Sequence, residues 1–171
     1  MYRILDFAMA DDSLRFEPQG ENIIFTTMRN AFMKEAREYA HHHSLDKAAP
    51  TGALMVKDDS VIGRGANGND YHNTHICERV RRGIPTGQRY DLCEGCHPKN
   101  HAEQRAIADA LKQKSDPQGA DLYLWGHWWF CRWCYEAMSK AGVRKVYLLS
   151  NSHKLFNKSH PGNIIGRQFA E

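Results

Sequence analysis

Two short motifs in this sequence combine metal-binding side chains with the start of a predicted helix. His101 and Glu103 lie in the segment NHAEQ, and Cys131 and Cys134 lie in the segment FCRWC. One imidazole and two thiolates give a tetrahedral zinc three ligands and leave one position open for water, as in a catalytic zinc site. Glu103 is close enough to His101 to exchange a proton with that water without being a ligand. Together the four residues predict hydrolytic zinc chemistry.

Each motif also has a simpler interpretation. Asn100 followed by Glu103 resembles a helix N-cap with a capping box. The pair Cys131 and Cys134 also matches the redox motif of thioredoxin-like proteins. Because both motifs together are much rarer than either one, we favour zinc catalysis over a helix cap and a redox pair.

The hydrophobic pattern indicates which elements carry these motifs. A helix is predicted in residues 23–43, with one apolar face formed by Phe25, Met28, Phe32, Ala36 and Tyr39. The three histidines at positions 41–43 are expected to be a solvated helix end. The segment TGALMVKDDSVIGRGANG predicts an antiparallel hairpin that turns at Asp58 and Asp59.

The second half of the chain predicts two helices and two strands. The segment HAEQRAIADALKQK is expected to be a helix whose core-facing residues are Ala102, Ala106, Ile107, Ala110 and Leu111. The segment ADLYLWG, a helix over residues 131–141 and the segment VRKVYLLS form a strand, helix, strand unit, which is a parallel crossover. Both metal-binding motifs therefore lie in first helical turns, where free N–H groups favour thiolates.

The order of these elements predicts an α/β fold with a mixed sheet. We divide the chain into an N-terminal extension (residues 1–22), one domain (23–150) and a C-terminal tail that packs on the domain (151–171). A length of 171 residues suits one domain with its own core.

Composition excludes several classes of protein. The sequence contains no apolar run long enough to span a membrane and no apolar segment typical of a signal peptide, so we expect a cytoplasmic protein. There the five cysteines, an odd number, are expected to be thiols or metal ligands rather than disulfides. The net charge of +3 is spread along the chain, which suits a small anionic substrate better than nucleic acid.

The HAE and CxxC motifs make the sequence resemble the cytidine and deoxycytidylate deaminase superfamily, whose signature is HxE followed by PCxxC. The resemblance covers roughly residues 24–150. The segment CERVRRGIPTGQRYDLC is similar to the segment before HAE in many deoxycytidylate deaminases. The family implies a three-layer α/β/α fold with a central mixed sheet of about five strands.

The resemblance also implies roles for individual residues. His101, Cys131 and Cys134 would bind one catalytic Zn²⁺, and Glu103 would move protons. The backbone N–H of Ala102 would hold the 2-oxo group of a pyrimidine.

For the hairpin, the resemblance implies that Asn67, at its end, would contact the sugar. The expected reaction is hydrolytic deamination of dCMP, or of a closely related cytosine nucleotide, to dUMP and ammonia. The alternatives are deamination of another base and a non-catalytic zinc-binding module.

Family members are usually oligomers, so a homo-oligomer is expected. The candidates for phosphate binding are Arg64, Arg89 and the region of Lys99.

Two features depart from the family pattern. Phe130, after Trp128 and Trp129, replaces the usual proline before the first zinc cysteine, so these aromatic residues bear on which base is accepted. The segment CEGCHPKN adds a second CxxC.

Some deoxycytidylate deaminases carry a second, structural zinc in the region of this added CxxC. We therefore predict either a second zinc or free thiols at Cys77, Cys93 and Cys96. The fourth ligand is open among three nearby histidines, His72, His75 and His97.

Overall fold

The computed structural model describes residues 3–4, 15–17, 22–85 and 87–170, so most of the predicted extension (residues 1–22) lies outside it. The strands are β1 (Arg3–Ile4), β2 (Arg15–Glu17), β3 (Ile23–Thr26), β4 (Gly52–Lys57), β5 (Ser60–Ala66), β6 (Asp121–Trp125), β7 (Phe130–Cys131) and β8 (Lys145–Leu149). The helices are α1 (Ala31–His43), α2 (Glu78–Arg81), α3 (Ala102–Lys112), α4 (Arg132–Lys140) and α5 (Ser152–Phe156). Short 3₁₀ turns are η1 (Tyr71–Asn73), η2 (Tyr90–Leu92), η3 (Glu94–Cys96) and η4 (Pro98–Asn100).

The central sheet has five strands in the order β3-β8-β6-β4-β5. Strands β3, β8 and β6 are parallel, whereas β4 runs antiparallel to both β6 and β5, so the sheet is mixed. The β4–β5 hairpin turns at Asp58 and Asp59, which both have positive φ angles of 48° and 56°, as a tight hairpin turn requires. The predicted α/β fold, the hairpin and the parallel crossover from β6 through α4 to β8 are confirmed.

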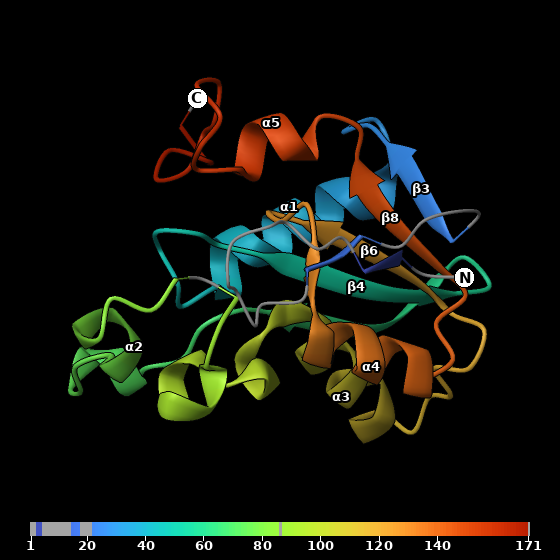
Figure 1. Ribbon diagram of the computed structural model, residues 1–171. Helices are drawn as coiled ribbons and strands as arrows, with labels where there is room; N and C mark the ends of the chain where they lie inside the picture. Colours follow the sequence, from blue (N-terminus) through green and yellow to red (C-terminus); the bar gives the residue numbers. More distant parts are fainter. Residues whose placement is uncertain (1–2, 5–14, 18–21, 86, 171) are drawn as a thin grey trace.

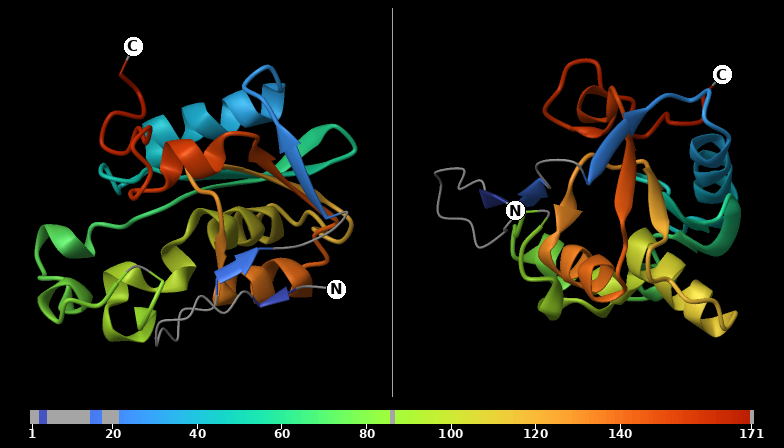
Figure 2. Two further views of the ribbon diagram at one scale, coloured as in Figure 1. Left: turned by 45° about the horizontal axis from the view of Figure 1, so that its top comes forward. Right: turned by 90° about the vertical axis from the view of Figure 1, so that its right-hand side faces the viewer.

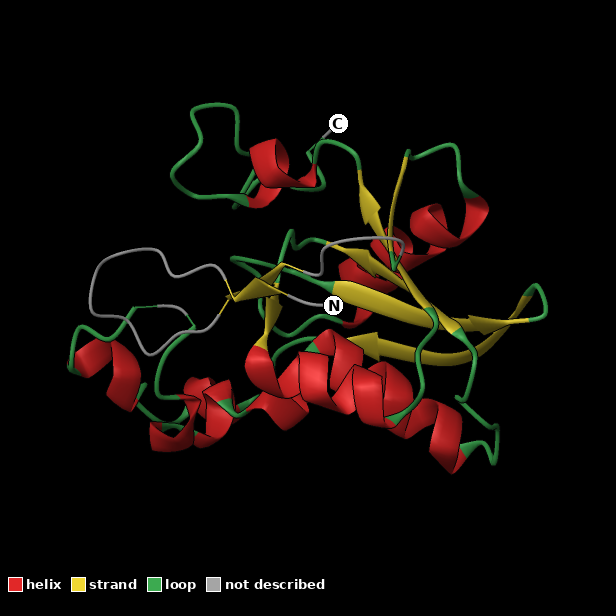
Figure 3. Cartoon of the chain, turned by 45° about the vertical axis from the view of Figure 1, so that its right-hand side comes forward, coloured by secondary structure: helices red, strands yellow, loops and turns green. Residues whose placement is uncertain are grey.

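Helices cover both faces of this sheet, which gives three layers. Figures 1 and 3 show α1 against one face and α3 with α4 against the other. Alternate residues of the buried strands divide between two cores: Leu122 and Leu124 pack toward α3 and α4, whereas Tyr123 and Trp125 pack toward α1. The C-terminal segment adds Phe156 to the core on the α1 side.

The predicted helix over residues 23–43 is wrong in its first part. Residues Ile23–Thr26 form β3, which pairs with β8, and α1 begins only at Ala31. Asn30 caps the helix because its side chain accepts a hydrogen bond from Met33 N at 3.0 Å. Phe25, which the helical pattern placed in the core, is 62% exposed. Residues 23–26 form a strand because Ile, Phe and Thr side chains favour strands and because the segment pairs with β8.

Helix α3 lies unusually close to β5. A Cβ atom built on Gly65 would lie 2.1 Å from Ala102 O, and one built on Gly63 would lie 2.3 Å from Ala106 O. Ala102, Ala106, Ile107 and Ala110 are buried as predicted. Glycines in β5 thus allow the start of α3 to rest directly on the sheet.

The prediction for Leu111, the last core-facing residue assigned to this helix, is wrong. Its side chain is 57% exposed. The sheet contacts of α3 therefore end one residue earlier, at Ala110.

Residues 67–101 form an irregular segment of short turns at one end of the sheet (Figure 2). Strand β2 pairs with β7, with Arg15 opposite Cys131 and Phe16 opposite Phe130. None of the described helices has the length and apolar character needed to cross a membrane. The division into extension, domain and tail stays a prediction.

Candidate metal centre and pocket

The two predicted motifs meet at the starts of α3 and α4. The His101 Nδ1 atom lies 3.3 Å from Cys134 Sγ and 3.4 Å from Cys131 Sγ. On a tetrahedral zinc with Zn–N and Zn–S bonds of about 2.0 and 2.3 Å, the nitrogen and a sulfur atom lie about 3.5 Å apart. The three ligand atoms, hereafter the helix cluster, therefore have a spacing that fits one zinc ion.

The environment of the helix cluster already favours thiolate. Cys131 is the N-cap of α4, and its Sγ accepts a hydrogen bond from Cys134 N at 3.4 Å. The hydrogen bond between the two thiols and the contact with His101 lower the pKa of Cys131 to about 5, although burial opposes the shift. The same thiol contact and burial raise the pKa of Cys134. Metal ligands must be deprotonated, so a cluster with one thiol already acidic is prepared for a cation.

Glu103 lies beside the helix cluster, on the first turn of α3. Its side chain is buried and interacts with the Cys134 thiol. Burial raises the pKa of this carboxyl to about 7, against the opposing effect of His101. A carboxyl with a pKa near the working pH can both accept and release a proton, as general acid–base catalysis requires.

The predicted capping box at this helix is not formed. His101, not Asn100, is the N-cap of α3. The Asn100 amide instead donates to Glu94 O at 2.8 Å and accepts from Arg105 Nη2 at 3.2 Å. Asn100 therefore ties the preceding turns to α3, and Glu103 is left without the capping role that the sequence allowed.

The helix cluster opens into a cavity of about 640 Å³, a size typical of small-molecule sites. His101, Cys131, Ala102, Glu103 and Asn67 all line it. The residues from other segments that share the wall are Asp46, Lys47, Arg79, Tyr90, His127, Trp128, Trp129, Asn157, Lys158 and Ser159. The C-terminal segment after α5 thus forms part of the pocket, which the sequence did not indicate.

Asn67 is held firmly at this wall. Its Oδ1 accepts from Ser44 Oγ at 2.6 Å and from Thr51 N at 2.8 Å, and its Nδ2 donates to Ala49 O at 2.9 Å. A side-chain amide has two N–H donors, so one remains available for a ligand.

A second group of metal-binding side chains lies in the irregular segment. His72, Cys77, Cys93 and Cys96 place their ligand atoms within 4.8 Å of one another, and we call them the loop cluster. His72 Nε2 lies 3.1 Å from Cys93 Sγ, and Cys77 Sγ lies 3.5 Å from Cys96 Sγ. The structure thus selects His72 among the three candidate histidines.

His72 fits in the loop cluster because the segment CEGC has a glycine, Gly95, between its two cysteines. A Cβ atom on Gly95 would lie 2.6 Å from His72 Nε2, so only glycine leaves room for the ring. Four ligands of the Cys₃His type suit a closed structural zinc.

The three cationic candidates for phosphate binding do not line the pocket. The guanidinium of Arg64 is paired with Glu35, that of Arg89 with Asp91, and the ammonium of Lys99 with Glu94. The pocket residues Lys47 and Lys158 lie in other segments, where no sequence motif indicated a binding role.

Comparison with known proteins agrees with the geometry of the helix cluster. The family model described as the cytidine and deoxycytidylate deaminase zinc-binding region matches residues 26–150. A search of curated proteins gave no significant match.

Several solved structures are similar to this chain. The dCMP deaminase of cyanophage S-TIM5 in complex with dCMP and dUMP is 27% identical, with a TM-score of 0.48, over 70% of this chain and 79% of that one. The guanine deaminase of Bacillus subtilis is 22% identical, with a TM-score of 0.42, over 69% of this chain and 62% of that one.

Proposed function

Because the chain belongs to the cytidine and deoxycytidylate deaminase family, we propose that it is a zinc-dependent hydrolytic deaminase that converts dCMP, or a closely related cytosine nucleotide, to dUMP and ammonia. The observation that carries this proposal is the helix cluster with buried Glu103 beside it, opening into a pocket of about 640 Å³. A structural zinc has no use for a carboxyl beside an open position, so the arrangement favours catalysis over a binding module.

In the proposed reaction His101, Cys131 and Cys134 would hold the zinc ion. Zinc bound there would supply a Lewis acid that lowers the pKa of a water molecule to about 7. Glu103 would take a proton from the attacking water and give it to the departing amino group. The low-polarity surroundings that raise its pKa to about 7 make both transfers accessible near neutral pH.

Two further residues orient the substrate. Ala102 is the first residue of α3, so its N–H has no acceptor within the helix and is available for the 2-oxo group of the base. Asn67 offers its remaining N–H to a sugar hydroxyl, and its three other hydrogen bonds keep the amide from rotating.

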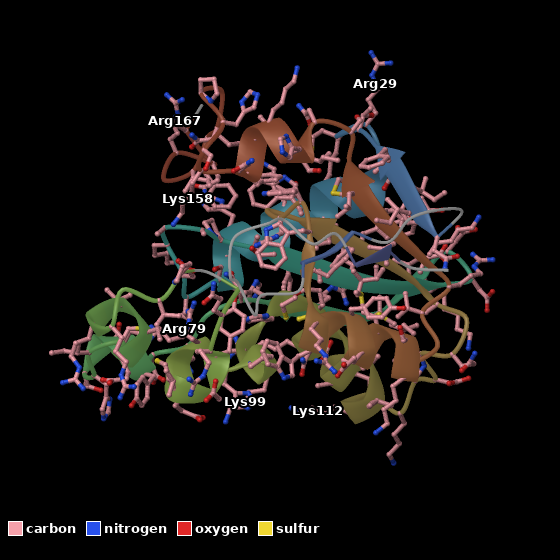
Figure 4. The ribbon with its side chains drawn as sticks, in the orientation of Figure 1. Arg29, Arg79, Lys99, Lys112, Lys158 and Arg167 are labelled. Carbon is pink, nitrogen blue, oxygen red and sulfur yellow. The ribbon has the colours of Figure 1, made fainter. Side chains whose placement is uncertain are left out.

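Cations at the pocket wall support a phosphorylated substrate. Lys158 lies on the segment after α5 (Figure 4), and among the residues that the structure describes its ammonium has no hydrogen-bond or ion-pair partner. Lys47 uses one donor, to Ser44 O at 2.6 Å, and keeps two. Asp46 also lines the pocket, but its carboxylate accepts from the backbone of Ala48 and Ala49. We assign the phosphate to the side of the pocket that carries the two lysines.

Substitution Lys158→Ala is therefore expected to raise KM for dCMP roughly fivefold and to leave KM for deoxycytidine nearly unchanged. An exposed charge pair contributes up to about 1 kcal/mol, which corresponds to this factor. Lys154→Ala is the matched control, because Lys154 is an exposed lysine of α5 that does not line the pocket. Equal changes in KM for both substrates would contradict phosphate binding by Lys158.

We also propose that the loop cluster holds a second, structural zinc. Its four ligand atoms complete a tetrahedral set with no open position, and a metal there would brace a long irregular segment. Elemental analysis of the purified protein is expected to give two zinc ions per chain. One zinc per chain at saturating zinc would mean that the four side chains are free.

A further inference from the structure

Tyr90 contacts His101 of the helix cluster and belongs to a small core against which Cys96 of the loop cluster packs. Its buried ring meets that of His101 edge to face, with centroids 5.0 Å apart and planes at 84°. The same small core contains Cys131 and Cys134, and the partly buried Cys96 of the loop cluster packs against it. Tyr90 thus restricts the orientation of the His101 imidazole from outside the helix cluster.

Arg79 fixes the position of Tyr90. Its buried guanidinium lies 4.5 Å from the centre of the Tyr90 ring. It also donates to Gln88 O at 2.7 Å and to Pro85 O at 2.6 Å, which satisfies the buried charge. Gly87 N in turn donates to the Tyr90 hydroxyl at 3.1 Å. The carbonyl oxygens of Pro85 and Gln88 and the ring of Tyr90 therefore surround the buried guanidinium of Arg79.

The loop cluster holds both ends of this segment. Arg79 follows Cys77 closely in the chain, and Tyr90 shortly precedes Cys93. A metal bound to Cys77 and Cys93 closes the loop that carries Arg79 and Tyr90, and thereby reduces the conformations open to both.

We propose that Tyr90, clamped by Arg79, is a positioning residue that couples the two clusters, so that metal in the loop cluster tightens metal binding by the helix cluster. This inference rests on the proposed function of both clusters as metal sites. Loss of a residue that contacts a metal ligand, without itself binding the metal, typically lowers metal affinity on the order of 10-fold or more.

The test is a double-mutant cycle on the full chain loaded with cadmium. Cadmium NMR gives each cluster its own resonance, because the shift depends on how many thiolates bind the ion. Competition with a chelator then measures the affinity of the helix cluster. Cys93→Ser, which removes a ligand of the loop cluster, and Tyr90→Leu are each expected to lower that affinity on the order of 10-fold. The double variant is expected to lose little more than either single variant, since both changes break the same connection.

Two matched controls separate positioning from general loss of packing. Tyr90→Phe keeps the ring against His101 and is expected to stay within about twofold of the wild type, given that only the hydroxyl contact is lost. Arg79→Met is expected to act like Tyr90→Leu. Arg82→Met is expected to have no effect, because Arg82 is an exposed arginine directly after α2, the helix that contains Arg79.

Three results would overturn the coupling. Additive losses in the double variant would show that the connection does not run through Tyr90. An unchanged affinity of the helix cluster for cadmium in Tyr90→Leu would show that Tyr90 does not position His101. Tyr90→Leu keeps all the metal ligands, so this test remains available if Cys93→Ser does not fold. Absence of a helix-cluster resonance in the wild type would overturn the metal site of the proposed function as well.

Discussion

Substitution Glu103→Gln is expected to lower kcat for dCMP by about three orders of magnitude while zinc stays bound to the helix cluster. General acid–base catalysis contributes typically 10² to 10⁴ in rate, and Glu103 is assigned both proton transfers. Glutamine has nearly the same volume, so the buried site keeps its packing, but it cannot exchange a proton. Steady-state kinetics and zinc analysis of the same preparation check both statements.

The matched control for this change is Glu136→Gln. Glu136 is an exposed glutamate of α4 that pairs with Arg132 at 2.7 Å, so its loss leaves the pocket untouched. Near wild-type turnover in Glu103→Gln would remove Glu103 from the mechanism. The other described carboxylate of the pocket, Asp46, accepts hydrogen bonds from the backbone of Ala48 and Ala49.

The second large effect is expected from Cys134→Ser. Cys134 is fully buried at the first turn of α4, and its Sγ is one of the three proposed zinc ligands of the helix cluster. A serine hydroxyl does not replace a thiolate on zinc, so we expect the loss of one zinc ion per chain and of all measurable deamination. Elemental analysis together with an ammonia assay measures the two losses in one sample.

Cys93→Ser provides the comparison for this variant. It removes a ligand of the loop cluster instead, so it is expected to lose the other zinc ion, while its helix cluster still fills at higher zinc concentration. A Cys134→Ser variant that keeps both zinc ions would show that Cys134 is not a ligand.

Both clusters could be predicted from the sequence because metal chemistry restricts residue types strongly. His101, Cys131 and Cys134 come from two helix starts, and the structure brings their ligand atoms together. The hairpin at Asp58 and Asp59 was equally predictable, since its turn chemistry is local. What these features share is that short motifs of restricted residue types mark each of them in the sequence.

Features that depend on distant contacts were not predictable. Phe25 lies at helical spacing from Met28 and Phe32, but the pairing of Ile23–Thr26 with β8 makes this segment a strand. Asn100 has the sequence of a helix cap, yet contacts with Glu94 and Arg105 give it another role.

The buried arginine and the fourth ligand of the loop cluster also required the structure. Arg79 stands in the sequence ERVRR among other arginines, and only the fold shows that it is the buried one. His72 was one of three candidate histidines. In the fold its ring lies against Gly95, where the absence of a side chain leaves room for it.

The most direct test of the proposed function is to incubate the zinc-loaded protein with dCMP, deoxycytidine, guanine and a cytosine-containing oligonucleotide in parallel. We expect equimolar dUMP and ammonia from dCMP, with a kcat/KM higher than for the other three substrates. Ammonia release from guanine or the oligonucleotide but not from dCMP would contradict the proposed substrate, and release from none of the four would contradict the assignment of a catalytic zinc.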